Sequence, residues 1–456
     1  MLDPEPLIIV GSSVRAAAQS AVRAGFSPWC IDQFGDRDLC EASNNVLIAA
    51  DWPNEIESII QSAPQAEWLY TGALENHPAL VEKLSQQRPL LGCGHETLSI
   101  VRDPAWLADT LAKASLPFLP VILPDSCVSD LSLEAGEWMA KPIASGAGIG
   151  VRNYQSNHAG ATDFGGYYLQ RKARGRVISG LYLGVGNSAV LLGMCEQLCR
   201  GIDAGEFCYV YSGSLGPLSA SDVSGFRPLS PANAATTKAQ AGSDALRIRG
   251  GEGWGEGESE QNCVDSTHQP LPNVSIDVFE QAQKIGTAIE AGIRTEGALL
   301  NGLFGIDFVL DEKTGELSTL EVNPRYTASA ELYERAFGWP LMRWHVDACR
   351  GADCDAQALL DSVAINGEWS KHGKLIVYAE RDFAAPDVVP LVERLSQNRS
   401  AECCVEVSDI PQLGTLIRKD EPVCTLLTSQ ENVSACHEVL LAASHELLAA
   451  IDAVAN

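Results

Sequence analysis

The segment from residue 299 to residue 325 constrains the fold of this chain more than any other part of the sequence. It contains two apolar stretches separated by the polar, glycine-containing stretch 311–316. This pattern predicts two strands joined by a tight turn. If the hairpin is folded about Thr314, Asp307 lies opposite Glu321.

Three oxygen-bearing side chains are expected to meet on one face of this hairpin. Glu321 and Asn323 share a face because side chains alternate along a strand, and directly opposed residues have Cβ atoms about 5 Å apart. Asp307 and Glu321 would repel each other unless a cation lies between them. Two carboxylates and an amide suit a hard cation such as Mg²⁺. Taken alone, the segment is explained equally well by a solvated hairpin whose acids face water.

A second informative stretch, 137–150, predicts a strand followed by a loop of small residues. Lys141 lies at the end of the strand, and the loop contains Ser145, Gly146 and Gly148. Small residues let backbone N–H groups approach phosphate oxygens, and a lysine adds a positive charge. The loop lacks the Gly-Lys-Ser/Thr ending of a Walker A sequence.

Taken together, the motif G-x-D-F…L-E-V-N-P-R and the lysine followed by a glycine-rich loop resemble the ATP-grasp superfamily. Within it, the order of elements resembles a group of predicted ATP-dependent carboligases related to biotin carboxylase. The resemblance implies that Asp307, Glu321 and Asn323 hold Mg²⁺, or Mn²⁺ in its place, at the β- and γ-phosphates of ATP. It also implies that Arg325 lies beside the transferring phosphoryl group and an acceptor carboxylate.

The same resemblance implies further contacts with the phosphates and the adenine of ATP. The residues concerned are Arg102, Lys141, Ser145, Gly146, Gly148, Gln170, Lys172 and Ala173. Many members of the family have Glu near position 170, so Gln170 is a departure that weakens a side-chain contact with adenine but not the backbone contacts. An exposed arginine near a helix start explains Arg102 equally well, and a basic strand end is the alternative for residues 170–175.

The order of predicted elements divides the chain into three units. Residues 1–97 contain strand, glycine turn, helix and strand, which indicates a Rossmann-like α/β unit that the resemblance identifies as a pre-ATP-grasp domain. Residues 98–350 would form the ATP-grasp domain, and 365–456 a small β-rich C-terminal domain. The composition of 229–273 predicts a disordered insertion. The expected fold class is therefore α/β and α+β.

The first unit also offers three polar residues after its strand at 68–72. The resemblance makes Thr71, Glu75 and Asn76 candidates for the acceptor pocket, because this domain often lends residues to it. Capping of the helix that follows explains the same residues at least as well.

Composition excludes several classes of partner. The chain has 59 acidic and 32 basic residues, a formal net charge of −27, which argues against a nucleic-acid partner held by phosphate contacts. No apolar run approaches 18 residues, so no membrane span is expected. The 14 cysteines include no C-x-x-C pair, which argues against structural zinc and favours reduced thiols in a cytoplasmic protein. The oligomeric state stays open, with a homodimer as one option.

The function implied by the resemblance is that of an ATP-dependent ligase. Arg325 and Lys141 would be catalytic, the carboxylate substrate would become an acyl-phosphate, and an amine, or less often a thiol, would attack it with release of ADP and phosphate. Two alternatives remain at this point. One is a bicarbonate-activating carboxylase like biotin carboxylase, and the other is a nucleotide-binding regulator without turnover.

Overall fold

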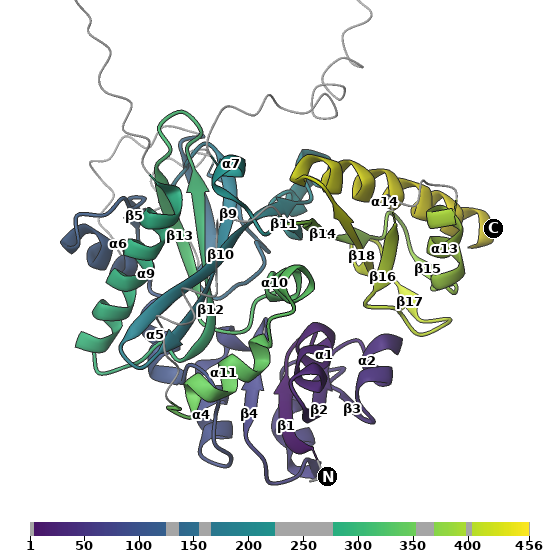
Figure 1. The fold of residues 1–456 in the computed structure, drawn as a ribbon, viewed down its shortest axis with the longest axis horizontal. Helices are drawn as coiled ribbons and strands as arrows, with labels where there is room; N and C mark the ends of the chain where they lie inside the picture. The colour runs from purple at the N-terminus through teal and green to yellow at the C-terminus, as the bar shows by residue number, and fades with distance from the viewer. Residues whose placement is uncertain are drawn as a thin grey trace, which may run out of the picture.

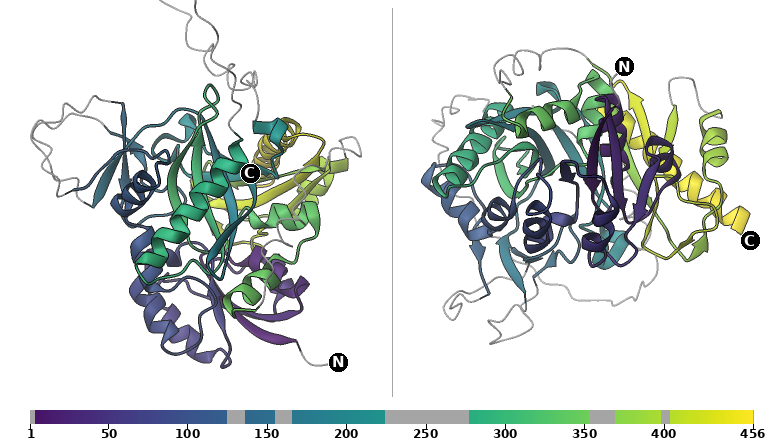
Figure 2. Two further views of the ribbon diagram at one scale, coloured as in Figure 1. Left: turned by 60° about the vertical axis from the view of Figure 1, so that its left-hand side comes forward. Right: turned by 90° about the horizontal axis from the view of Figure 1, so that it is seen from below.

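The structure is a computed structural model, drawn in Figures 1 and 2. It describes residues 4–124, 136–154, 166–223, 277–352, 369–397 and 404–455. The insertion predicted to be disordered, 229–273, lies outside the described residues.

The N-terminal part is a four-stranded parallel sheet in the order β3-β2-β1-β4, with helices packed against it. Its elements are β1 (Glu5–Val10), α1 (Arg15–Arg23), β2 (Phe26–Asp32), α2 (Arg37–Ala42), β3 (Asn45–Ile48), α3 (Ile56–Ile59), β4 (Trp68–Tyr70) and α4 (Pro78–Ser85). The residues of β1 from Leu7 to Val10 are almost fully buried, as expected of a central parallel strand covered on both faces. The Rossmann-like alternation predicted for this part is confirmed.

A small antiparallel sheet follows, in the order β5-β8-β6-β7. This region comprises α5 (His95–Val101), α6 (Pro104–Lys113), β5 (Val121–Ile122), β6 (Trp138–Pro142), β7 (Arg152–Asn153) and β8 (Tyr167–Arg171). The predicted strand that carries Lys141 is β6, and the glycine-containing loop connects it to β7.

The largest sheet has eight strands, all paired antiparallel, in the order β13-β12-β9-β10-β11-β14-β18-β16. Its strands are β9 (Arg176–Val185), β10 (Ser188–Cys199), β11 (Tyr211–Gly216), β12 (Gly302–Leu310), β13 (Leu317–Asn323), β14 (Lys371–Tyr378), β16 (Val405–Ser408) and β18 (Pro422–Gln430). Because β14 pairs with β11, the C-terminal strands continue the central sheet across the limit predicted between the second and third units. The predicted domain limits themselves stay predictions.

Helices cover this sheet along its length (Figure 1). They are α7 (Ala220–Val223), α9 (Val278–Thr295), α10 (Ala330–Phe337), α11 (Leu341–Cys349), α13 (Val389–Gln397) and α14 (Val433–Ala455), and a two-stranded ribbon of β15 (Phe383–Ala384) and β17 (Leu416–Ile417) lies near the C-terminus. In α9, Ala282, Ile285, Ile289 and Ile293 recur at helical spacing and are fully buried in the main core. Asp277 caps this helix by accepting from the Phe279 N–H at 2.9 Å.

The C-terminal strands and the N-terminal sheet lie side by side, as the view from below shows (Figure 2). A backbone hydrogen bond joins the two parts, since the Arg37 N–H at the start of α2 donates at 2.8 Å to the carbonyl of Ile410, which follows β16. Among the described residues, no helix combines the length and the apolar character that a bilayer crossing requires.

Candidate active site

The β12–β13 hairpin brings the three predicted metal ligands together. Asp307 pairs with Glu321, as predicted, and Asn323 lies two residues further along the same strand. The Asn323 side-chain amide donates to Asp307 Oδ2 at 2.9 Å and lies 3.5 Å from Glu321 Oε1. Gln197 of β10 donates to the other Asp307 oxygen at 2.8 Å.

A β-bulge in β13 brings Glu321 opposite Asp307. From the turn outward, Leu310 pairs with Leu317 and Phe308 with Thr319, so the strands begin in a register that would leave Asp307 opposite Leu320. The register then shifts by one residue, and Asp307 pairs with Glu321 instead. The extra residue on β13 therefore places both carboxylates on the same face.

The electrostatics of these carboxylates fit a bound cation. Burial, and then the charge of Glu321, raise the pKa of Asp307 to about 6. Among the described residues, no group of three or more His, Cys, Asp and Glu side chains is arranged to hold a metal, so a cation here needs the Asn323 amide as a third ligand. Its oxygen can face the carboxylates after a rotation of the amide, which distances between heavy atoms allow. The oxygen set suits Mg²⁺ or Mn²⁺.

Lys141 lies on β6 of the small sheet, within electrostatic range of the hairpin acids. Its side chain is half-buried, and burial lowers the pKa of the ammonium while the charges of Glu321 and Asp307 oppose that effect. The charges of Glu321 and Asp307 therefore act on Lys141, which belongs to a separate sheet. We call Asp307, Glu321, Asn323 and Lys141 the hairpin site.

The glycine-containing loop after β6 is packed tightly against its neighbours. A Cβ on Gly148 would lie 2.0 Å from the Tyr209 carbonyl oxygen, and its φ of 76° favours glycine. The Tyr211 N–H donates to the Ala147 carbonyl at 2.9 Å, which ties the loop to β11. The Ser145 hydroxyl closes the loop internally on the Ile149 carbonyl at 2.6 Å.

Arg102 joins this loop to the turn after β4. Its guanidinium donates to the Ser145 carbonyl at 2.5 Å and to the Asn76 side chain at 2.7 Å. The Arg102 side chain is therefore half-buried and has two hydrogen-bond partners, whereas the alternative predicted an exposed arginine. Its contact with ATP phosphates stays a prediction.

The residues predicted at adenine separate into two groups. Gln170 is buried on β8, its amide donates to the Leu320 carbonyl at 3.3 Å, and its oxygen has no hydrogen-bond partner among the described residues. Lys172 is exposed and donates to Asn153 at 2.8 Å, away from the hairpin, while Ala173 is half-buried. The structure therefore brings Gln170 to the hairpin but not the Lys172 side chain.

Arg325 is paired with an acid of the N-terminal part. The Arg325 Nε donates to Glu75 Oε1 at 2.7 Å, and the Glu75 side chain is fully buried. The other oxygen of this carboxylate, Oε2, has no hydrogen-bond partner in the described part of the chain. Helix α4 begins with His77 as its N-cap and no side-chain cap bond, so capping does not explain Glu75.

The other two candidates from this turn have local partners. The Thr71 hydroxyl donates to the Ser13 carbonyl at 3.0 Å. Asn76 donates to the Ala73 carbonyl at 3.3 Å and accepts from Arg102. Sequence reasoning missed Gln197, whose signal was a polar residue within a strand that is otherwise largely apolar and buried.

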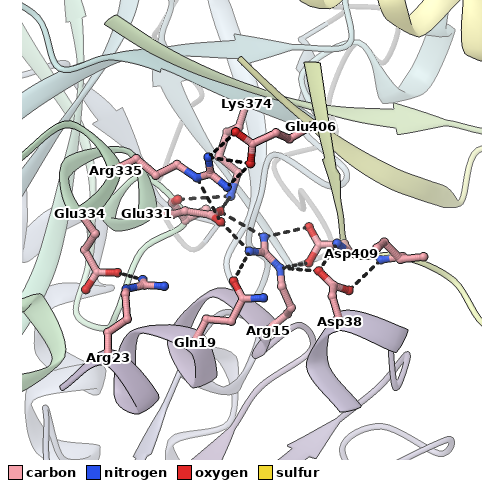
Figure 3. Close-up of polar contacts among 12 residues, drawn as sticks. Arg15, Gln19, Arg23, Asp38, Glu331, Glu334, Arg335, Lys374, Glu406 and Asp409 are labelled. Carbon is pink, nitrogen blue, oxygen red and sulfur yellow. Dashed lines mark hydrogen bonds and ion pairs between the residues drawn. The ribbon is translucent and has the colours of Figure 1, made fainter. Parts of the chain in front are cut away.

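A second cluster of charges lies where three distant parts of the chain meet (Figure 3). Glu331 of α10 accepts from Arg15 of α1 at 2.5 Å and from Lys374 of β14 at 2.9 Å. Arg15 also donates to Asp409, which follows β16, at 2.8 Å. We call these four residues the ionic junction. It was not predicted from the sequence.

The ionic junction holds the segment that carries Arg325. Helix α10 begins five residues after Arg325, and Lys374 also lies 3.4 Å from the Ala328 carbonyl in that connection. Burial opposes ionisation of Glu331, yet Lys374 and Arg15 hold its pKa well below the usual value. Each member of the junction therefore has an oppositely charged partner at hydrogen-bond distance.

Comparison with known proteins gives a match in structure but not in sequence. No protein-family model matches the chain, and no curated protein does. The biotin carboxylase domain of 2-oxoglutarate carboxylase from Hydrogenobacter thermophilus, solved with magnesium-ADP and bicarbonate, is 12% identical, with a TM-score of 0.60 over 96% of this chain and 89% of its own.

Two further structures match over nearly the full length of both chains. N5-carboxyaminoimidazole synthase from Aspergillus clavatus, with ADP and 5-aminoimidazole ribonucleotide, is 11% identical, with a TM-score of 0.60 over 98% of this chain and 99% of its own. L-amino acid ligase from Bacillus licheniformis is 12% identical, with a TM-score of 0.60 over 98% of each chain. At such identities the likeness establishes the fold, and this chain has the ATP-grasp fold that the hairpin and the glycine-containing loop predicted.

Proposed function

We propose that this chain is an ATP- and Mg²⁺-dependent ligase that activates a carboxylate as an acyl-phosphate and joins it to an amine, with release of ADP and phosphate. One observation carries the proposal. Two carboxylates and an amide meet on the hairpin within electrostatic range of Lys141, and Arg325 follows the same strand. This arrangement combines a site for a hard cation with two cations of the protein itself.

Each side chain has a task in this reaction. Asp307, Glu321 and Asn323 would hold Mg²⁺, which would neutralise negative charge at the nucleotide phosphates. Lys141 offsets further phosphate charge. Arg325 presents a planar pair of donors that orients the acceptor carboxylate beside the phosphoryl group.

The loop after β6 protects the product of the first step. An acyl-phosphate is hydrolysed by water, so the site has to exclude solvent until the amine attacks. The close packing of Gly148 on Tyr209 and the bond from Arg102 to Ser145 support a closed loop over the phosphates. The C–N bond then forms as the bond from the acyl carbon to the phosphate oxygen breaks.

The matching structures support the choice of ligands. One was solved with magnesium-ADP and bicarbonate and another with ADP and an aminoimidazole ribonucleotide, so small acids and amines together with ATP and Mg²⁺ are the substrates and cofactors proposed here. We also propose a cytoplasmic location, in keeping with free cysteines among the described residues. A homodimer is part of the proposal, because one matching structure is a dimer.

The proposal is tested by ADP release from Mg-ATP with pooled carboxylates, bicarbonate among them, and pooled amines. We expect release that requires Mg²⁺ and one acid, and mass spectrometry should find an amide that contains both substrates. Release with bicarbonate and no amine would instead favour a carboxylase. If no pool gives ADP above the rate of an Asp307→Asn control, the ligase proposal is wrong.

A further inference from the structure

The structure points to a binding site for the amine, and this inference rests on the proposed ligase function. We propose that Glu75 binds the amine substrate as its ammonium ion, and that the acceptor carboxylate frees Glu75 for this task by taking its place on Arg325. The substrate class follows from the chemistry: it is a primary amine that binds as its ammonium ion, gives one proton to the Glu75 carboxylate and then attacks the acyl-phosphate as the neutral amine.

The first support is the unused half of the Glu75 carboxylate. Its side chain is fully buried, Oε1 accepts from Arg325 at 2.7 Å, and Oε2 has no hydrogen-bond partner among the described residues. An ionised carboxylate can accept about four hydrogen bonds, and a buried acceptor without one is costly. An ammonium ion, which carries three donors and a positive charge, satisfies this oxygen.

The second support is the position of Glu75 between the loop and Arg325. A Cβ on Gly146 would lie 3.4 Å from Glu75 Oε1, so the glycine-containing loop lies close to the carboxylate. Arg102 bonds both Ser145 of that loop and Asn76, the neighbour of Glu75. An amine on Glu75 is therefore held beside the carboxylate that Arg325 orients.

The third support is that Arg325 has to be released before it can serve the acceptor. Its Nε is occupied by Glu75 at 2.7 Å, whereas its terminal nitrogens make only longer contacts, 3.3 Å to the Tyr326 carbonyl and 3.4 Å to Asn323. A substrate carboxylate that binds the guanidinium through two nitrogens competes with Glu75. After the exchange, Arg325 pairs with the acid and Glu75 with the ammonium, so no buried charge is left alone.

The test measures acyl-phosphate formation and attack by the amine separately, in the full-length protein with Mg-ATP. Hydroxylamine, which is mostly uncharged at neutral pH, traps the acyl-phosphate as a hydroxamate and does not need a carboxylate to bind it. In Glu75→Gln, which keeps an acceptor for Arg325, hydroxamate formation should stay within about threefold of the wild type. The KM for the amine should rise by about 10- to 100-fold, the range for loss of a hydrogen bond to a charged group.

A matched control is Glu57→Gln, an exposed acid of the same part of the chain that pairs with Lys83, and both reactions should be unchanged in it. Equal losses of hydroxamate and amide in Glu75→Gln would show that Glu75 only holds Arg325 in place. An unchanged KM for the amine would equally overturn the inference.

A second measurement uses the wild-type protein, so it does not depend on how a variant folds. Trimethylammonium, which carries one N–H donor and cannot form a stable amide, should inhibit amide formation in competition with the amine and leave hydroxamate formation unaffected. Inhibition of both reactions alike, or of neither, contradicts an ammonium site. If the wild type forms neither ADP nor hydroxamate from any acid, the proposed function itself fails, and the inference fails with it.

Discussion

Two clusters of charged side chains, each partly or fully buried, can be compared in this molecule, the hairpin site and the ionic junction. Both combine acids and bases from elements far apart in the sequence. In the hairpin site the pKa of Asp307 is raised to about 6 by burial and Glu321, and burial lowers the pKa of Lys141. In the ionic junction the pKa of Glu331 lies well below its usual value.

The difference teaches how a ligand site can be told from a structural one. In the junction each charge has its opposite at hydrogen-bond distance, so the cluster is complete without a ligand. The hairpin site holds two neighbouring carboxylates whose charge the protein compensates only in part. Substitutions should therefore change catalysis in the first cluster and stability in the second.

The largest effect is expected at the hairpin. Asp307→Asn should lower Mg²⁺-dependent ADP release by about a thousandfold, because it removes charge that a cation needs. The melting temperature should stay the same or rise, since the repulsion with Glu321 is relieved. ADP release measures the loss of activity, and thermal unfolding followed by circular dichroism measures the melting temperature. Full activity would show that Asp307 is not a metal ligand. A large loss of stability would show that the hairpin site, like the ionic junction, stabilises the fold.

The next effect is expected in the ionic junction. Glu331→Gln leaves Arg15 and Lys374 buried without their shared acid, which should lower the free energy of unfolding by about 3 kcal/mol. Urea unfolding measures this change. A loss below about 1 kcal/mol would mean that the pairing is not what holds this junction together.

A smaller effect concerns pH and the affinity for the cation. Because the pKa of Asp307 is raised to about 6, protons compete with the metal below that pH. We expect the affinity for Mn²⁺ without nucleotide, measured by water-proton relaxation, to fall by up to about tenfold per pH unit below 6. The sign follows from the acid, since protonation removes the charge that binds metal. Equal affinities at pH 7 and pH 5 would contradict it.

The smallest effect is expected at the exposed rim of the junction. Glu406 accepts from Arg335 at 3.1 Å, but its side chain is 58% exposed (Figure 3). Glu406→Gln should change the free energy of unfolding by less than about 1 kcal/mol, because water and salt screen exposed pairs. The same urea titration used for Glu331 provides the comparison. A loss as large as that of Glu331→Gln would show that burial does not separate these pairs.

The sequence could predict what depends on local patterns. Alternating apolar residues around a polar turn predicted the hairpin and the pairing of Asp307 with Glu321, although the register contains a bulge at Leu320 that no local pattern indicates. The strand that carries Lys141 and the loop after it were likewise visible as a short motif. The site assignments for ATP stay predictions.

What the sequence could not predict depends on contacts between distant segments. Glu75 and Arg325 are 250 positions apart, and although the resemblance made each a candidate for the acceptor pocket, no local pattern shows that the two side chains pair. The same holds for Arg15 and Asp409, which are 394 positions apart. Periodicity indicated the strand at β14 but not its partner, so the continuation of the central sheet into the C-terminal part was not foreseen.

The continuous eight-stranded sheet has a consequence for how the protein unfolds. A polypeptide ending at residue 352 would keep Lys141, Arg325 and the hairpin, yet it would lose β14 and expose the edge of β11. It would also lose Lys374 and Asp409, the C-terminal half of the ionic junction. The predicted nucleotide-binding part and the tail should therefore melt in a single calorimetric transition, and the shortened polypeptide should aggregate instead of retaining half of the activity.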